Sequence, residues 1–196
     1  MMGLHPCSVK ENYREELTLV KQKLFSGKYI AVGEIGMDLY WDKTFVAQQE
    51  EAFITQIKWA NELGLPVSIH SRESTSQLIE ILDKKITSEK KGVFHCFTGT
   101  KEEAERLIGM GFYLGIGGVV TFKNSHLPTL LKEIGMDKLE LESVSPYLAP
   151  TPHRGKRNES SYTNLVALKL ADIFGVSLPE VSEVTTRNAM QVFKLN

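Results

Sequence analysis

The stretch Ile30-Ala-Val-Gly-Glu34-Ile-Gly36 decides the fold class, because it is a short apolar run interrupted near its end by one acidic side chain. Two later runs have the same form, and each ends in a histidine: Pro66-Val-Ser-Ile-His70 and Gly92-Val-Phe-His95. The gaps of 36 and 25 residues between the three polar positions suit one strand and one helix each. In parallel barrels, polar residues at the C-terminal ends of strands form the active site. The pattern therefore predicts three residues of metal-ligand type at one edge of a parallel sheet.

Five short apolar runs and the helical patterns between them predict the architecture. The predicted strands are Tyr29–Gly36, Pro66–His70, Gly92–Phe97, Phe112–Gly118 and Leu139–Ser143. Apolar residues at helical spacing predict helices over Glu11–Leu24, Val46–Leu63, Leu127–Ile134 and Thr163–Phe174, and capping patterns start others at Ser74, Thr100 and Ser177. This alternation predicts an α/β fold, a parallel (β/α) barrel of the TIM type.

The length of the chain limits how much of such a barrel it can form. The chain has 196 residues, and a complete eight-unit barrel has about 250. We therefore expect one domain over residues 1–196 that lacks its first strand-helix units. A barrel left open exposes a sheet edge, here the strand beginning at Tyr29, and open edges pair with other chains. Self-association through this edge is the expected consequence.

Composition excludes several classes of protein. With 42% hydrophobic and 24% charged residues the chain is typical of a soluble enzyme, and no apolar run approaches the roughly 18 residues of a membrane span. Its net charge of -1 gives no general attraction for polyanions, so binding of nucleic acid would need a local basic cluster such as His153–Arg157. The two cysteines, Cys7 and Cys96, form no disulfide pattern, and Cys96 is expected inside a strand. A reducing cytoplasm is the expected compartment.

Six motifs in order resemble those of the TatD-type metal-dependent deoxyribonucleases, and the similarity extends to Thr186–Phe193. The motifs are Gly3-Leu-His-Pro6, Gly33-Glu-Ile-Gly-Met-Asp38, Ile69-His-Ser-Arg72, Phe94-His-Cys-Phe-Thr-Gly99, Ser145-Pro-Tyr-Leu-Ala-Pro150 and His153-Arg-Gly-Lys-Arg-Asn-Glu159. The resemblance implies a (β/α)₈ barrel that hydrolyses the phosphodiester bonds of DNA with two divalent metal ions at its C-terminal mouth. The family is in turn similar to the wider amidohydrolase superfamily.

The resemblance also implies roles for single residues. Glu34, His70 and His95 correspond to the ligands of one metal ion, Zn²⁺, Mg²⁺ or Mn²⁺, with Glu34 bridging to the other ion and therefore catalytic. The second site of the family uses a His-x-His pair from a first strand, before the start of this chain, and an Asp where this chain has Val144. One metal site of two is thus expected to be intact. Since a positioned base contributes about 10²- to 10⁴-fold, we expect slow turnover.

Other polar residues have open alternatives. Arg72, Arg154 and Lys156 could bind substrate phosphates, or they could be ion-paired or solvated surface residues. Tyr40 and Trp41 could stack on a base or pack in the fold.

Further polar residues have simpler expected roles. His5 could approach the site from a preceding strand, but a position on a frayed N-terminus is the stronger expectation. Asp38 is expected to order its loop. Glu142, the nearest substitute for the missing Asp, is expected to pair with a basic neighbour instead.

Three functions remain open at this point. The first is a nuclease-like phosphodiesterase. The second is an inactive one-metal remnant that binds nucleic acid or a phosphorylated ligand. The third is a one-metal amidohydrolase-like enzyme that acts on a small molecule.

Overall fold

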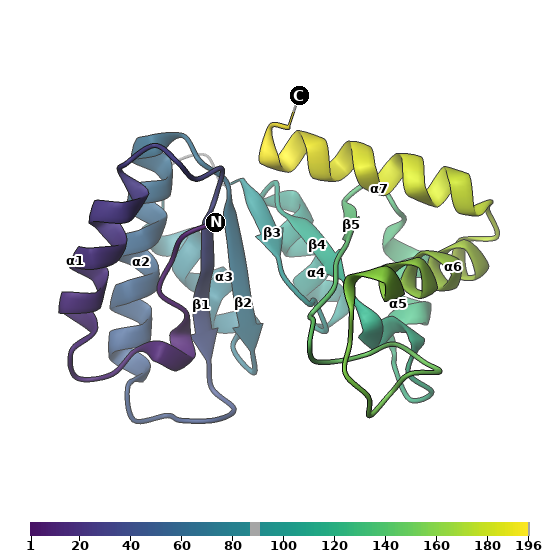
Figure 1. Ribbon diagram of the computed structural model, residues 1–196, viewed down its shortest axis with the longest axis horizontal. Helices are drawn as coiled ribbons and strands as arrows, with labels where there is room; N and C mark the ends of the chain where they lie inside the picture. The colour runs from purple at the N-terminus through teal and green to yellow at the C-terminus, as the bar shows by residue number, and fades with distance from the viewer. Residues whose placement is uncertain (87–90, 196) are drawn as a thin grey trace. The chain divides into compact units, whose positions relative to one another are not determined.

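The computed structural model describes residues 1–86 and 91–195 and has five parallel strands in the order β1-β2-β3-β4-β5 (Figure 1). Its contacts divide the chain into two compact units. The first unit comprises Met1–Phe94, Met110–Phe112 and Val192–Lys194, and the second comprises the remaining residues from His95 onward. This is the parallel α/β architecture that the alternation of strands and helices predicts.

The first unit contains three parallel strands with helices between them. Its elements are η1 (Pro6–Ser8), α1 (Tyr13–Leu24), β1 (Val32–Asp38), α2 (Val46–Leu63), β2 (Val67–Arg72), α3 (Thr75–Lys85) and β3 (Gly92–Phe94). β1 pairs with β2 from Val32↔Val67 to Asp38↔Arg72, and β2 pairs with β3 from Val67↔Gly92. In Figure 1, α1 and α2 lie side by side next to β1. The parallel pairing brings the C-terminal ends of β1 and β2 to one edge.

The N-terminal segment lies along β1, and this corrects two expectations. Met2 forms a parallel bridge with Val32: the Met2 N–H donates to the Ala31 carbonyl (3.3 Å), and the Gly33 N–H donates to the Met2 carbonyl (3.1 Å). The edge of the strand beginning near Tyr29 is therefore not open at this point. Nor is the segment frayed at His5, because the flanking Leu4 and Pro6 are buried. Hydrogen bonds to β1 explain the first correction, and burial of the residues beside His5 explains the second.

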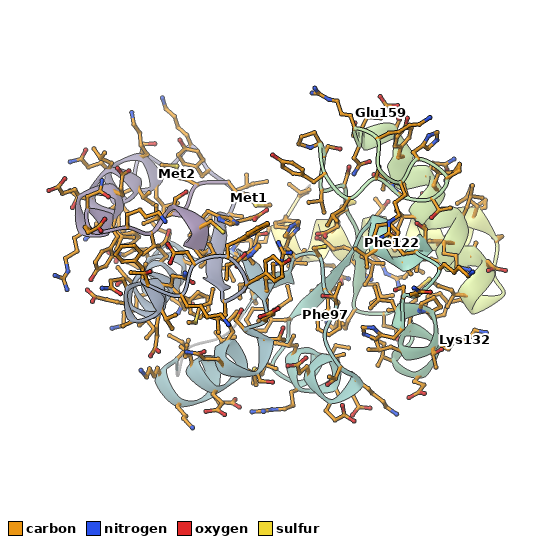
Figure 2. The ribbon with its side chains drawn as sticks, turned by 90° about the horizontal axis from the view of Figure 1, so that it is seen from below. Met1, Met2, Phe97, Phe122, Lys132 and Glu159 are labelled. Carbon is orange, nitrogen blue, oxygen red and sulfur yellow. The ribbon has the colours of Figure 1, made fainter. Side chains whose placement is uncertain are left out.

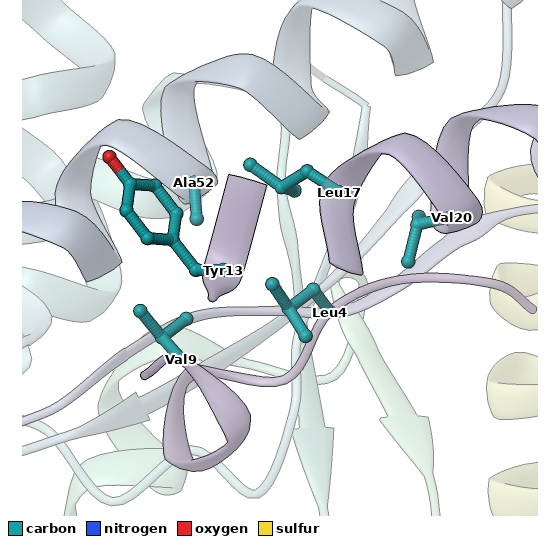
Figure 3. Packing of buried hydrophobic residues seen from close by; sticks show 6 residues of the cluster. All are labelled: Leu4, Val9, Tyr13, Leu17, Val20 and Ala52. Atoms are coloured by element: carbon teal, nitrogen blue, oxygen red, sulfur yellow. The ribbon is translucent and has the colours of Figure 1, made fainter. Parts of the chain in front are cut away.

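A side chain of α2 makes further hydrogen bonds to the backbone of the N-terminal segment. Gln56, which is fully buried, accepts the Leu4 N–H through Oε1 (2.6 Å) and donates Nε2–H to the Leu4 carbonyl (3.2 Å). Leu4 then packs into a core cluster shown in Figure 3, which consists of Leu4, Val9, Tyr13, Leu17, Val20 and Ala52. Burial of these side chains fixes the residues that precede and follow His5.

The second unit has two parallel strands and the later helices. Its elements are α4 (Lys101–Gly109), β4 (Tyr113–Ile116), η2 (Gly118–Thr121), α5 (Leu127–Ile134), β5 (Leu139–Leu141), η3 (Ser160–Tyr162), α6 (Thr163–Phe174) and most of α7 (Leu178–Phe193). β4 pairs with β5 from Leu114↔Leu139 to Ile116↔Leu141. The buried Asn188 on α7 donates to the carbonyls of Met136 (3.2 Å) and Leu139 (2.7 Å), which ties α7 to the start of β5.

Two of the predicted helix caps form and one does not. Thr100 and Glu103 exchange hydrogen bonds at the start of α4, which confirms the capping box, and the Ser177 hydroxyl accepts the Glu180 N–H (3.3 Å). The Ser74 hydroxyl instead donates to the Met37 carbonyl (2.8 Å), so the capping box predicted there is wrong. That acceptor comes from β1, far away in sequence.

The strand predicted over Gly92–Phe97 ends early. β3 stops at Phe94, and Cys96 has a positive φ of 47°, which ends the extended chain. Cys96 therefore lies in the turn after β3 and not inside a strand.

Candidate metal centre

The pairing of β1 with β2 brings a carboxylate and an imidazole together. His70 is the Cα partner of Gly36, and Glu34 lies two residues before Gly36 on β1, where the register shifts between Val32 and Ile35. Gly36 has a φ of +141°, and a Cβ there would collide with the His70 carbonyl oxygen. Only glycine allows this close approach of the two strands, because any other residue adds a Cβ.

His5 joins these two residues from the N-terminal segment. Its Nε2 lies 3.2 Å from Glu34 Oε2, and the same oxygen lies 3.7 Å from His70 Nδ1. One ligand atom from each residue lies within 4.8 Å of the others. The two imidazole rings meet edge to face with centroids 4.5 Å apart. We call His5, Glu34 and His70 the His–Glu–His trio.

Asp38 fixes the orientation of His70. Its side chain is 2% exposed, and Oδ2 lies 2.9 Å from His70 Nε2. Burial alone would raise the pKa of the Asp38 carboxyl, but hydrogen bonds from His70 and from the N–H groups of Trp41 and Tyr40 hold this pKa below its ordinary value. An ionised carboxylate only accepts hydrogen bonds, so His70 Nε2 carries the proton. The lone pair on His70 Nδ1 therefore faces Glu34.

His5 is held in the opposite tautomer. Its Nδ1 accepts the N–H of Cys7 (3.1 Å), so the proton of the neutral ring is on Nε2 and points to Glu34. His5 could bind a cation through Nε2 only after this hydrogen bond breaks and the proton moves. Partial burial and the negative charge of Asp38 raise the pKa of the Cys7 thiol to about 11, so this thiol is protonated at neutral pH.

The donor set fits a divalent cation. One carboxylate oxygen and two imidazole nitrogens are ligands that Zn²⁺ and similar ions take in proteins, with positions left for water. Glu34 and His70 offer lone pairs as they stand, and Asp38 supplies the carboxylate that metal-binding histidines commonly need on their other nitrogen. His5 is the one member that must rearrange to bind.

His95 belongs to the second unit, where it contacts a carboxylate. Its Nδ1 lies 2.9 Å from Glu142 Oε2, and the Cys96 N–H donates to Glu142 Oε1 (2.5 Å). This confirms that Glu142 pairs with a basic neighbour. A Cβ on Gly115 would collide with the Glu142 carboxylate, so a larger residue there would displace this carboxylate from its present position. That His95 shares one ion with Glu34 and His70 stays a prediction.

Glu140 is a second carboxyl group on β5, and it is 7% exposed. Burial, with the nearby charge of Glu142, raises the pKa of Glu140 to about 7, while His95 acts in the opposite direction.

The three predicted phosphate-binding residues have different surroundings. The Arg72 guanidinium lies 3.7 Å from the ring centroid of Tyr40, and that of Arg154 lies 4.2 Å from the ring centroid of Phe122, which Figure 2 labels. Within residues 1–86 and 91–195, Arg72 has no carboxylate partner. Lys156 is exposed on its loop. Phosphate binding by these residues stays a prediction.

Sequence reasoning gave His5 a place near the site only as the weaker of two alternatives, and the structure supports that alternative. The available signal was the Gly3–Pro6 motif, because Gly3 leaves no room for a side chain: a Cβ there would lie 2.9 Å from Ile35 Cγ2. The role expected for Asp38 is confirmed, since its Oδ1 accepts the N–H groups of Tyr40 (3.0 Å) and Trp41 (3.2 Å). Its bond to His70 was not foreseen.

Comparisons with known proteins agree over the length of the chain. A family model described as TatD related DNase matches residues 1–194. The uncharacterized metal-dependent hydrolase YabD of Bacillus subtilis is 40% identical over all of this chain and 77% of its own length. The 3'-5' ssDNA/RNA exonuclease TatD of Edwardsiella piscicida is 32% identical over 98% of this chain and 76% of its own length.

A solved structure has the same fold. The TatD homologue YjjV of Escherichia coli is 27% identical and superposes with a TM-score of 0.92, which covers 100% of this chain and 76% of that one. A helix able to cross a membrane, both long and apolar enough, does not occur in the described part of the chain.

Proposed function

Because the chain belongs to the TatD related DNase family, and so to the metal-dependent hydrolases, we propose that it cleaves phosphodiester bonds of nucleic acid. The observation that carries this proposal is the His–Glu–His trio, with Glu34 on β1 and His70 on the paired strand β2, and with the exposed cation of Arg72 two residues beyond His70. A cation beside a metal site suits an anionic substrate. The exonuclease named among the similar proteins supports the same substrate class.

Each residue has a definite part in this proposal. A bound divalent ion would lower the pKa of a water molecule and offset phosphate charge. Glu34 and the Nδ1 lone pair of His70 would hold the ion, and Asp38 keeps the His70 ring in the required tautomer. Arg72 would donate to phosphate oxygens of the substrate. The free thiols of Cys7 and Cys96 support our proposal of a reducing compartment, the cytoplasm.

The test is release of nucleotides from DNA with Mg²⁺, Mn²⁺ or Zn²⁺. We expect metal-dependent release by the wild-type chain and none by His70→Ala. His126→Ala is the matched control, since it removes an imidazole in the second unit whose Nε2 contacts the Gly99 carbonyl (3.0 Å). Release that His70→Ala leaves unchanged would contradict the proposal.

A second candidate follows from Val144. It lies after β5, and its carbonyl accepts the Tyr147 N–H (2.7 Å), but its side chain can neither bind a metal nor accept a proton. If a base is needed at this position, the chain binds metal and nucleic acid without fast turnover. Metal-dependent binding with no release would favour this candidate, and robust release abolished by His70→Ala would exclude it. We expect little rescue from Val144→Asp alone.

A further inference from the structure

Two large aromatic side chains follow β1 and are left in solvent. Tyr40 is 48% exposed and Trp41 is 69% exposed. Their rings meet edge to face with centroids 4.8 Å apart. Folding buries large aromatic rings where it can, so a pair of exposed rings marks a surface for binding. The alternative that these rings pack inside the fold is thereby overturned.

A cation shares this surface. The Arg72 guanidinium lies 3.7 Å from the centroid of the Tyr40 ring and 5.1 Å from that of Trp41. Tyr40 thus holds Arg72 in place, while Trp41 keeps most of its ring area exposed. An aromatic ring beside a guanidinium offers one base a stacking surface and its phosphate a bidentate donor.

The aromatic pair is joined to the trio through one side chain. Asp38 accepts the N–H groups of Tyr40 and Trp41 on Oδ1 and faces His70 Nε2 with Oδ2. Arg72 is the Cα partner of Asp38 across β1 and β2. A ligand that lies on these rings is therefore held at a fixed place relative to His70.

Trp41 also lines a cavity of about 260 Å³ whose walls include Pro6, Val9 and Phe45. Two polar residues at this cavity are already engaged. Gln49 accepts the Asp38 N–H (2.9 Å) and donates to the Asp38 carbonyl (3.3 Å).

Lys10, the other of these polar residues, pairs with Asp42 (3.2 Å). The site therefore offers apolar and aromatic area with few spare groups to read the edge of a base. Such a site suits any base and not one sequence.

We propose that Tyr40, Trp41 and Arg72 form a stacking site that positions one unpaired nucleobase of the substrate beside the trio. The inference rests on the proposed function and names the residues that would position its substrate. A base in a duplex has both faces covered by its neighbours, so only an unpaired base can lie on Trp41.

Binding is tested by fluorescence of Trp41. The chain has two tryptophans, and Trp59→Phe leaves Trp41 as the only emitter. The titration is done in chelator with three probes of equal length: an oligothymidylate, an abasic oligonucleotide and a duplex. We expect saturable quenching by the oligothymidylate and at least about tenfold weaker binding of the other two. Equal quenching by the abasic probe would overturn the stacking site, because that probe carries the same phosphates.

Kinetics give the second test. Trp41→Ala should raise the KM for oligothymidylate about 5- to 100-fold with little change in kcat, and Trp41→Phe should restore most of the loss. Cleavage of the abasic oligonucleotide should not respond to Trp41→Ala. An unchanged KM would refute the inference even if His70→Ala abolishes cleavage. If no variant cleaves, the proposed function fails, and the fluorescence titration still decides whether the base binds.

Discussion

Asp38 and Cys7 put the two histidines of the trio into different tautomers, and this difference has a measurable consequence. His70 presents a lone pair to Glu34, whereas His5 presents a proton. We predict at most one tightly bound divalent ion per chain. His70→Ala should abolish binding, and His5→Ala should weaken it less, because His5 must first lose its bond from Cys7. Elemental analysis of reloaded protein and zinc titration of both variants check this, and two tight ions per chain would contradict it.

The Asp38 carboxylate can be tested by itself. Asp38→Asn keeps the shape of the side chain but removes the charge that holds the proton on His70 Nε2. We expect zinc affinity to fall about 10- to 100-fold. Asp42→Asn is the control, since it removes the same charge from the same loop, where the partner is Lys10. Equal losses of zinc affinity in both variants would show that the negative charge alone, and not the contact of Asp38 with His70, sets the affinity.

At the same scale, sequence reasoning found the residues that interrupt or follow apolar runs and gave too little weight to His5, which long-range contacts bring in. Glu34 and His70 each end an apolar run, so their pattern was local. His5 joins them only because Gln56 and the core cluster hold the segment around Leu4. No spacing within the sequence encodes such a contact.

At the scale of elements, helices were predicted more accurately than strands. α2, α5 and α6 have the predicted bounds, because helical periodicity and caps are local signals. β3 is shorter than predicted, since the turn at Cys96 cuts an apolar run that continues to Phe97. Ser74 was misread because its acceptor, the Met37 carbonyl, comes from another element.

The buried carboxyl of β5 predicts a pH dependence. Glu140 has a pKa of about 7, raised by burial and by Glu142 from the ordinary 4.5. Between these values the unfolded chain gives up its proton before the folded chain does, so the free energy of unfolding falls as pH rises. Glu140→Gln should match the wild type at pH 5 and exceed it at pH 8 by on the order of 1–3 kcal/mol. Urea unfolding at both pH values measures this, and parallel pH profiles would disprove it.

The bonds between α2 and the N-terminal segment give a further prediction. Gln56→Ala leaves the N–H and carbonyl of Leu4 without these partners, which should cost about 1–3 kcal/mol in the free energy of unfolding. Because His5 follows Leu4, zinc affinity should fall as well. Gln48→Ala, a less buried change on the same helix, is the control. Hydrogen exchange at Leu4 that stays as slow as in the wild type would refute the role of Gln56.

For the whole molecule, self-association stays a prediction, but the reason given for it needs revision. Met2 occupies the edge of β1 where an open strand was expected. We therefore expect association to depend on how firmly this segment is held, with a larger mass for Gln56→Ala than for the wild type in light scattering. Equal masses for Gln56→Ala and the wild type would show that association does not depend on this edge of β1.

The family could be identified from sequence because its six motifs are spread along the whole chain, and the fold followed from the alternation of strands and helices. The contacts that the residues of these motifs make within each unit could not be predicted from the sequence. In the second unit the Glu142 carboxylate contacts His95 and accepts the Cys96 N–H, over separations of 47 and 46 residues in the sequence, respectively.

Asp38 has one last consequence, in the energetics of binding. The same carboxylate restrains the His70 ring and the backbone of Tyr40 and Trp41. A cation that immobilises His70 also immobilises the loop that carries the rings, so a base that arrives later loses less conformational entropy. Thermodynamic reciprocity then requires the base to raise the affinity for the cation by the same factor. The chain would thus bind its metal ion most tightly while a strand of nucleic acid is bound at the aromatic pair.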